Sequence, residues 1–119
     1  MRTILVDDHP AYLAALAKVL QRHPGIEIVG QAYNGQEGLK LAAALKPDLV
    51  LVDFSMPDMN GAQVVAALKA GSAPPRVIVV SNHDEQEYRE RAFKSGADGY
   101  ALKSELDEEL TPLLKRLIG

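Results

Sequence analysis

The chain has 119 residues, of which 47% are hydrophobic and 24% are charged, and its formal net charge at pH 7 is -3. These values are typical of one folded domain with one core, and they exclude a disordered or low-complexity protein. No clustered basic face is visible, so we expect no direct nucleic-acid binding, and the lack of cysteine excludes disulfides and thiolate chemistry. Short apolar runs and the lack of a signal segment predict a cytoplasmic protein without membrane contact.

Short apolar runs alternate along the chain with longer segments of helical periodicity, which is the pattern of βαβ units around a parallel sheet. The predicted strands cover Thr3 to Val6, Glu27 to Gln31, Leu49 to Val52, Arg76 to Val80 and Gly99 to Leu102. The first, third and fourth are nearly continuous Ile, Leu and Val, as in central strands covered on both faces. The second and fifth are more polar or begin with glycine, which predicts positions at the edges of the sheet.

Apolar residues at helical spacing lie between the predicted strands, and each such stripe can cover one face of the sheet. Three stripes are formed by Leu13-Leu16-Leu20, Leu39-Ala42-Leu45 and Val64-Val65-Leu68. Helix starts are predicted at Asn34, Asp84 and Ser104, because each precedes an acidic residue by three positions. Gly71 and Gly96 stand where helices should end, since glycine readily adopts positive φ.

Polar side chains follow four of the predicted strands. Asp7 and Asp8 follow the first strand, Asp53 the third, Ser81 the fourth and Lys103 the fifth. The carboxyl ends of parallel strands meet at one edge of the sheet, so these side chains should lie together. Close carboxylates repel by roughly a few kcal/mol per pair, which predicts a bound cation, and hard oxygen ligands favour Mg²⁺. Asp53 could then act as a nucleophile toward a phosphoryl group, with Lys103 and Ser81 facing its charge.

These residues carry a resemblance to a known family that extends over the whole chain. The matching positions are Asp7-Asp8, Asp53, Met56-Pro57, Gly61, Ser81, Tyr100 and Lys103. The chain resembles the receiver domain of a bacterial two-component response regulator, which implies one receiver domain over residues 1–119. The resemblance implies an α/β, flavodoxin-like, doubly wound fold with a five-stranded parallel sheet in the order 2-1-3-4-5 and five helices.

The resemblance also implies roles for individual residues. Asp53 would be the phosphoacceptor for a sensor histidine kinase. Mg²⁺ would be bound by Asp8, Asp53 and the backbone carbonyl of Ser55. Asp7 would reach the ion through water, and Lys103 would form a salt bridge with the phosphate. Such a chain is a signalling switch and not an ordinary enzyme, although it assists its own phosphorylation and dephosphorylation.

In receivers of this kind, phosphorylation favours a second conformation. The resemblance implies that the Ser81 hydroxyl moves toward the phosphoryl group and that the Tyr100 ring rotates inward. This would remodel a surface formed by the fourth helix, fifth strand and fifth helix, roughly residues 84–95 and 99–118. Such a surface often forms a homodimer or docks an output domain.

Three segments narrow the resemblance: Val6-Asp7-Asp8-His9-Pro10, Ser81-Asn82-His83-Asp84 and Gly99-Tyr100-Ala101-Leu102-Lys103-Ser104. They look like receivers that precede a LuxR-type helix-turn-helix domain, which implies transcriptional output through a domain absent from this chain. Because the chain ends at Gly119, directly after the last predicted helix, we expect a stand-alone receiver or the N-terminal part of a longer regulator. His9 is interpreted as a residue at a helix start, and His83 as a loop side chain near the site.

Other classes of protein with similar folds fit the sequence less well. An FMN carrier would need a Gly/Ser/Thr-rich phosphate loop after the first strand, where Asp7 and Asp8 would repel a phosphate. A haloacid-dehalogenase-type phosphatase would need Asp-x-Asp, but Phe54 and Ser55 follow Asp53. A P-loop enzyme would need G-x-x-x-x-G-K-[ST], which the sequence lacks. One alternative stays open, a receiver-like interaction module that works without phosphorylation.

Overall fold

The structure is a computed structural model that describes residues 1–118, so Gly119, the last residue of the predicted domain, lies outside the described residues. The strands are β1 (Arg2–Val6), β2 (Glu27–Ala32), β3 (Leu49–Asp53), β4 (Arg76–Ser81) and β5 (Gly99–Leu102). The helices are α1 (Pro10–Leu20), α2 (Gly35–Leu45), α3 (Gly61–Lys69), α4 (Gln86–Lys94) and α5 (Leu106–Ile118), with a short 3-10 helix, η1 (Lys103–Glu105), before α5.

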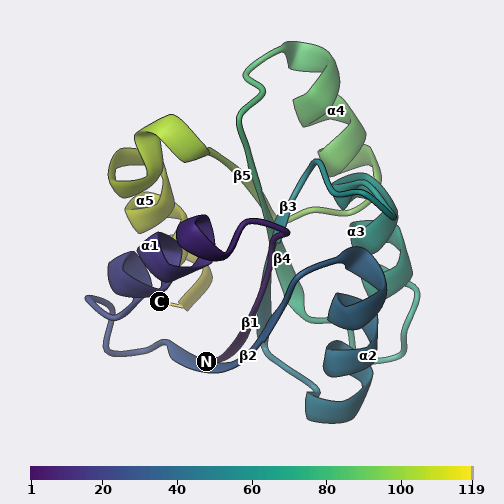
Figure 1. Cartoon of the computed structure of the whole chain (residues 1–119), viewed down its shortest axis with the longest axis horizontal. Helices are drawn as coiled ribbons and strands as arrows, with labels where there is room; N and C mark the ends of the chain where they lie inside the picture. The colour runs from purple at the N-terminus through teal and green to yellow at the C-terminus, as the bar shows by residue number, and fades with distance from the viewer. Residues whose placement is uncertain (119) are drawn as a thin grey trace.

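The five strands form one sheet in the order β2-β1-β3-β4-β5, and every neighbouring pair is parallel. Helices α1 and α5 cover one face of the sheet, and α2, α3 and α4 cover the other (Figure 1). This is the flavodoxin-like, doubly wound arrangement, and it confirms the predicted strand order and the edge positions of the second and fifth strands. Within residues 1–118, no helix has the length and apolar character that spanning a bilayer would require.

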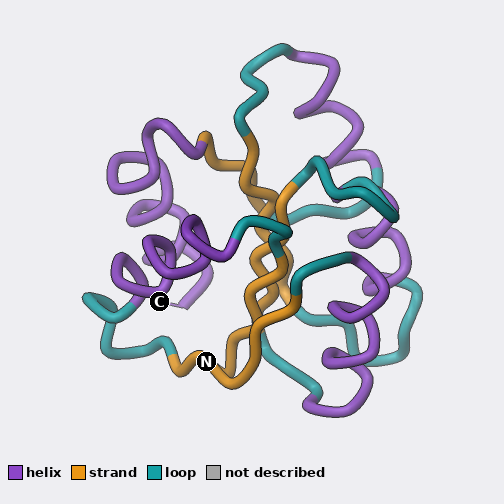
Figure 2. Tube along the Cα trace, in the orientation of Figure 1, coloured by secondary structure: helices purple, strands orange, loops and turns teal. Residues whose placement is uncertain are grey.

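Helices flank the strands on both sides (Figure 2), and the hydrophobic core has one layer on each face of the sheet. Side chains of a strand alternate between faces, so each central strand contributes to both layers. In β3, Val50 and Val52 pack with the layer of α2, α3 and α4, whereas Leu49 and Leu51 pack with Leu13 and other leucines of α1 and α5. All five residues of β3 are buried, which explains why its sequence is a continuous apolar run that ends in one acid.

The predicted helix starts agree with the structure at one of three positions. Asn34 caps α2, and its side chain accepts a hydrogen bond from the backbone amide three residues on, at 2.9 Å. Asp84 was the wrong cap for α4: Glu85 precedes the helix, and the Asp84 carboxylate instead forms an ion pair with an arginine of α4 at 2.9 Å. Ser104 was also wrong, because it lies inside η1 and α5 begins later, at Leu106.

The predicted helix ends agree at one of two positions. Gly96 follows α4 with a φ of +110°, and its amide donates to the Phe93 carbonyl, so it closes the helix as expected. Gly71 does not act this way: α3 ends at Lys69, the C-cap residue Ala70 has a right-handed φ of -74°, and Gly71 has no positive φ. The left-handed residue after α2 is Lys46, with a φ of 48°, which a search for glycine cannot find.

Gly61 allows the start of α3 to lie directly against the end of β3. A Cβ at this position would stand 2.8 Å from the Phe54 Cα and 2.9 Å from the Asp53 carbonyl oxygen. The Gly61 amide also donates a hydrogen bond to the Phe54 carbonyl at 2.6 Å. Because Gly61 has no side chain, the loop that follows Asp53 can return to lie directly against the end of β3.

A Gly61→Ala variant should be less stable than the wild type by about 1–3 kcal/mol, because the added methyl group must displace backbone. Equilibrium unfolding in urea measures this difference. Gly71→Ala is the matched control: a Cβ there would meet only the Leu68 carbonyl oxygen, at 3.7 Å, so its unfolding free energy should change little. Equal effects of the two substitutions would contradict the close approach at Gly61.

Candidate functional site

An acidic cluster forms where β1 and β3 end. These strands are neighbours, and Val6 pairs with Val52, so Asp7 and Asp53 emerge side by side from the sheet. Asp7, Asp8, His9 and Asp53 each offer one ligand atom, and these atoms all lie within 4.8 Å of one another. The convergence of the aspartates follows directly from the parallel pairing of two strands that each end in acid.

Lys103 joins the cluster from the end of β5. Its Nζ atom lies 2.8 Å from Asp7 Oδ2 and 3.4 Å from Asp53 Oδ1. The three side chains are almost fully buried, with exposed fractions of 8% for Lys103, 3% for Asp7 and 5% for Asp53. A buried charge is costly unless it is paired, and here one ammonium compensates two carboxylates. The centre therefore keeps an excess of negative charge that a further cation could offset.

Burial and the neighbouring Asp7 carboxylate raise the pKa of Asp53 from 3.8 to about 6, although Lys103 and the Ser55 amide act in the opposite direction. The folded protein thus holds the Asp53 proton more tightly than the unfolded chain does. Ionised Asp53 consequently opposes folding. This destabilisation is absent well below pH 3.8, where both states are protonated, and it grows until the pH passes about 6.

In magnesium-free buffer, Asp53→Asn should raise the free energy of unfolding at neutral pH by about 1–2 kcal/mol, after allowance for partial solvent screening of the pKa shift. The amide is neutral at every pH, so the gain should shrink as the pH falls toward about 4. Urea unfolding of both proteins across this pH range measures the difference. A variant that is less stable than the wild type at neutral pH would contradict the charge repulsion described here.

Asp8 supplies an unpartnered oxygen to the cluster. Its Oδ1 atom is buried and accepts no hydrogen bond within the described part of the chain. The His9 Nδ1 atom lies 3.1 Å from this oxygen and 3.2 Å from Asp7 Oδ1, without hydrogen-bond geometry toward Asp8. Buried carboxylate oxygens without donors are the ligands that Mg²⁺ prefers. The residues present therefore fit a divalent cation.

His9 flanks the start of α1, as the sequence predicts, and makes no side-chain cap there. Its ring is 65% exposed and lies against both Asp7 and Asp8. This contact with the acidic cluster is a feature that the interpretation as a helix-start residue missed. The only sequence signal was its position directly after the acidic pair.

Ser81 ends β4 and Tyr100 lies within β5, and the same loop residue, His83, holds both side chains. The buried Ser81 Oγ accepts a hydrogen bond from the His83 amide at 3.0 Å, and the Tyr100 hydroxyl donates to the His83 carbonyl at 2.7 Å. The Tyr100 ring is only 4% exposed, and the Arg89 guanidinium lies 4.8 Å from its centre. The ring thus already faces inward, and His83 connects the two residues predicted to form a switch.

The loop after β3 is tied to the start of α2. Asp53 Oδ1 accepts a hydrogen bond from the Ser55 amide at 3.4 Å, at the beginning of this loop. Further along, the Asp58 carboxylate accepts hydrogen bonds from the amides of Gly35 and Gln36, both at 2.9 Å. These contacts hold the pKa of Asp58 below its usual range. Sequence analysis missed them because the two segments are far apart in the chain.

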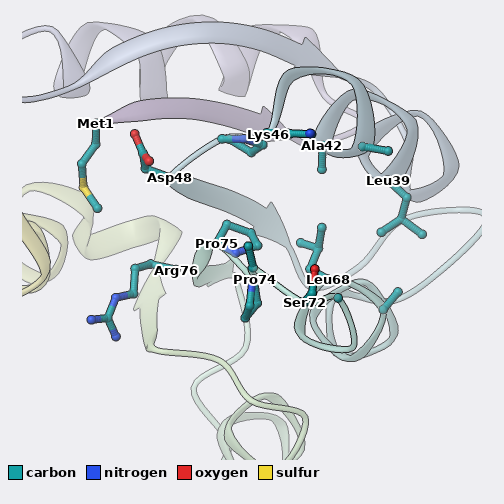
Figure 3. A pocket seen from close by; sticks show the side chains of 15 residues that line it. Met1, Leu39, Ala42, Lys46, Asp48, Leu68, Ser72, Pro74, Pro75 and Arg76 are labelled. Carbon is teal, nitrogen blue, oxygen red and sulfur yellow. The ribbon is translucent and has the colours of Figure 1, made fainter.

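A separate groove of about 900 Å³ lies at the opposite edge of the sheet, near the residues that begin β3 and β4. Helices α2 and α3 line it with small and apolar side chains such as Ala42 and Leu68, and Pro74 and Pro75 form another wall (Figure 3). None of the predicted site residues lines this groove. The acidic cluster and the groove are therefore distinct features of the molecule.

Comparison with known proteins agrees with this fold and identifies the family. Residues 3–115 match the family model of the response regulator receiver domain. The nitrate/nitrite response regulator protein NarL of Escherichia coli K12 is 43% identical over 116 residues, which cover 96% of this chain and 51% of that protein. The positive alginate biosynthesis regulatory protein of Pseudomonas aeruginosa is 39% identical over 117 residues, which cover 98% of this chain and 46% of that protein.

Solved structures show the same likeness. The signal receiver domain of NarL from Mycobacterium tuberculosis gives a TM-score of 0.90 at 35% identity, covering 99% of this chain and 96% of that chain. A DNA-binding response regulator of the LuxR family from Staphylococcus aureus gives a TM-score of 0.90 at 27% identity, covering 99% and 98%.

A doubly wound sheet with three aspartates and a lysine at its carboxyl edge defines a receiver, and this chain belongs to the response regulator receiver domain family. Within that family its relatives are NarL-type response regulators of the LuxR class. The sequence segments 6–10, 81–84 and 99–104 predicted this subfamily. The chain spans about half the length of the curated relatives it matches.

Proposed function

We propose that this chain is a phosphorylatable receiver, formed by residues 1–119, and that Asp53 accepts a phosphoryl group from a sensor histidine kinase. The observation that carries the proposal is the position of Lys103, which bridges the buried carboxylates of Asp7 and Asp53. A structural ion pair needs one acid, whereas this arrangement places a second acid beside the first and leaves an oxygen of Asp8 unpartnered. Such an excess of negative charge suits a site that binds a cation during phosphoryl transfer.

Mg²⁺ would be held by Asp8, Asp53 and the backbone carbonyl of Ser55, with Asp7 reaching it through water. When bound, the ion would neutralise negative charge at the centre and draw phosphoryl oxygens toward it. The unpartnered Asp8 oxygen supports this proposal. The His9 Nδ1 atom lies 3.1 Å from Asp8 Oδ1, so the imidazole ring would have to leave room for an ion that binds this oxygen.

In the proposed reaction, a carboxylate oxygen of Asp53 attacks the phosphorus of a phosphohistidine. A new oxygen–phosphorus bond forms, the nitrogen–phosphorus bond breaks, and the electron pair returns to the imidazole, which takes a proton from water. With a pKa of about 6, Asp53 is largely ionised at neutral pH and can act as the nucleophile. Lys103 would then exchange part of its contact with the carboxylate for a salt bridge to the phosphoryl oxygens.

We propose that Ser81 and Tyr100 transmit the modification. The Ser81 hydroxyl would turn from the His83 amide toward the phosphoryl group, and the buried position of Tyr100 would be stabilised. Both changes act on the segment between β4 and α4, and so on the α4-β5-α5 surface. This surface would form a homodimer or dock an output domain that controls transcription, consistent with the DNA-binding, LuxR-family relatives. The family context also supports a cytoplasmic location.

Intact-mass measurement tests the proposal after incubation with acetyl phosphate, with and without Mg²⁺. The wild-type chain should gain one phosphoryl group only when Mg²⁺ is present, because the repulsion among three carboxylates must be offset before an anion can approach. A known receiver treated in parallel is the control for the reagent. If that control reacts and this chain does not, the chain is instead an interaction module that works without phosphorylation.

A further inference from the structure

Tyr12 lies in the first turn of α1 and contacts Lys103 of the proposed site, although the sequence analysis did not name it as a site residue. The Lys103 ammonium stands 4.3 Å from the centre of the Tyr12 ring. A cation within about 6 Å of a ring centre is attracted by the negative face of the ring, and the attraction grows when both groups are desolvated. Lys103 is 8% exposed, so this contact is largely shielded from water.

Lys103 therefore has three partners, two carboxylates and one aromatic face. The two carboxylates differ in the proposed reaction, because phosphorylation converts Asp53 into an acyl phosphate and moves its negative charge outward. The ring contact does not depend on the state of Asp53. A lysine side chain is long and flexible, and a contact that persists through the reaction limits the positions the ammonium can adopt.

The hydroxyl of Tyr12 gives a second sign that this residue lies beside the charged centre. It is buried and has no hydrogen-bond partner among the described residues. Burial, with the nearby carboxylates of Asp7 and Asp53, raises the pKa of this hydroxyl above its ordinary value, so the group stays neutral. The Tyr12 side chain also packs against the leucine-rich layer under α1 and α5, which holds the ring in place.

We propose that Tyr12 is a positioning residue for phosphoryl transfer, and that its ring face holds the Lys103 ammonium between Asp7 and Asp53. The inference rests on the proposed function, because the position of Lys103 matters for transfer only if Asp53 is phosphorylated. It concerns the ring and not the hydroxyl, so phenylalanine should substitute for tyrosine and leucine should not.

The rate of phosphorylation by acetyl phosphate and Mg²⁺ tests whether Tyr12 affects phosphoryl transfer. Tyr12→Leu should react about tenfold more slowly than the wild type, and Tyr12→Phe should react at nearly the wild-type rate. Tyr33→Leu, which removes a tyrosine that is 49% exposed, is the matched control and should have no effect. In a Lys103→Ala background, Tyr12→Leu should cause no further loss, because the partner of the ring is gone.

A wild-type rate in Tyr12→Leu, or an equal loss in Tyr12→Phe and Tyr12→Leu, would overturn the inference. So would a full additional loss in the Lys103→Ala background, which would assign the effect to packing of α1. Each of these outcomes leaves phosphorylation of Asp53 intact, whereas an unreactive wild type would reject the proposed function itself.

A measurement without phosphorylation tests the contact directly. The Lys103 ammonium lies over the Tyr12 ring. The NMR signals of the adjoining ε-methylene protons should therefore be shifted upfield by the ring current. The shift should persist in Tyr12→Phe and disappear in Tyr12→Leu, while the dispersion of the other signals shows that the variant is folded. If the ε-methylene protons of Lys103 have an ordinary chemical shift in the wild type, the inference is overturned whatever the reactivity of Asp53.

Discussion

An Asp53→Asn variant should gain no mass when it is incubated with acetyl phosphate and Mg²⁺, whereas the wild-type chain should gain one phosphoryl group. Asparagine has nearly the same shape as aspartate, so it should fit the buried position at the end of β3. Its amide is neutral and is a poor nucleophile, so the attack on phosphorus should fail. The expected effect is therefore complete loss of modification in a folded protein.

Asp58→Asn is the matched control for this experiment. Asp58 belongs to the same loop, but its carboxylate contacts backbone amides of α2 and lies outside the acidic cluster. This variant should gain a phosphoryl group as the wild type does. Modification of Asp53→Asn to the wild-type level would end the assignment of Asp53 as acceptor.

Lys103→Ala should lower the free energy of unfolding in magnesium-free buffer by about 3–5 kcal/mol, because it leaves two buried carboxylates without their cation. Mg²⁺ should restore part of this loss, since an ion that binds only the folded state stabilises it. Urea unfolding with and without Mg²⁺ measures both effects. The variant should still accept a phosphoryl group, more slowly than the wild type, but hydrogen exchange in the α4-β5-α5 surface should no longer respond to it.

Lys69→Ala provides the comparison for the magnesium effect. Lys69 also forms a partly buried ion pair, with Asp98 at 2.7 Å, and its loss should destabilise the protein as well. Asp98 lies outside the acidic cluster, so Mg²⁺ should rescue this variant no more than it stabilises the wild type. Equal rescue of both variants would show that the ion does not act at the cluster.

Much of the fold could be predicted because its central strands are buried on both faces. The runs around β1, β3 and β4 are almost purely apolar, and their predicted bounds differ from the structure by about one residue. Helix α4 gave no such signal, since only Ala92 in it is fully buried and its remaining residues are mostly charged or polar. Its start was misplaced because the Asp84 side chain bonds to an arginine instead of capping the helix.

The centre of the site could be predicted from the rule that parallel strands end at one edge. That rule brings Asp7, Asp8, Asp53 and Lys103 together without any knowledge of side-chain conformation. Tyr12 could not be found in this way, because its contact depends on the angle at which α1 leaves the strand. Asp8 precedes α1, so the helical periodicity of that segment carries no signal for this contact either.

The most direct test of the central claim is to locate the phosphoryl group in the wild-type chain. Borohydride reduces an aspartyl phosphate to homoserine, and peptide mapping by mass spectrometry then identifies the altered position without any substitution. Treatment with acetyl phosphate and Mg²⁺ followed by borohydride should place homoserine at position 53 and nowhere else. Homoserine at Asp7 or Asp8, or an unchanged Asp53 in a sample that has gained a phosphoryl group, would contradict the account.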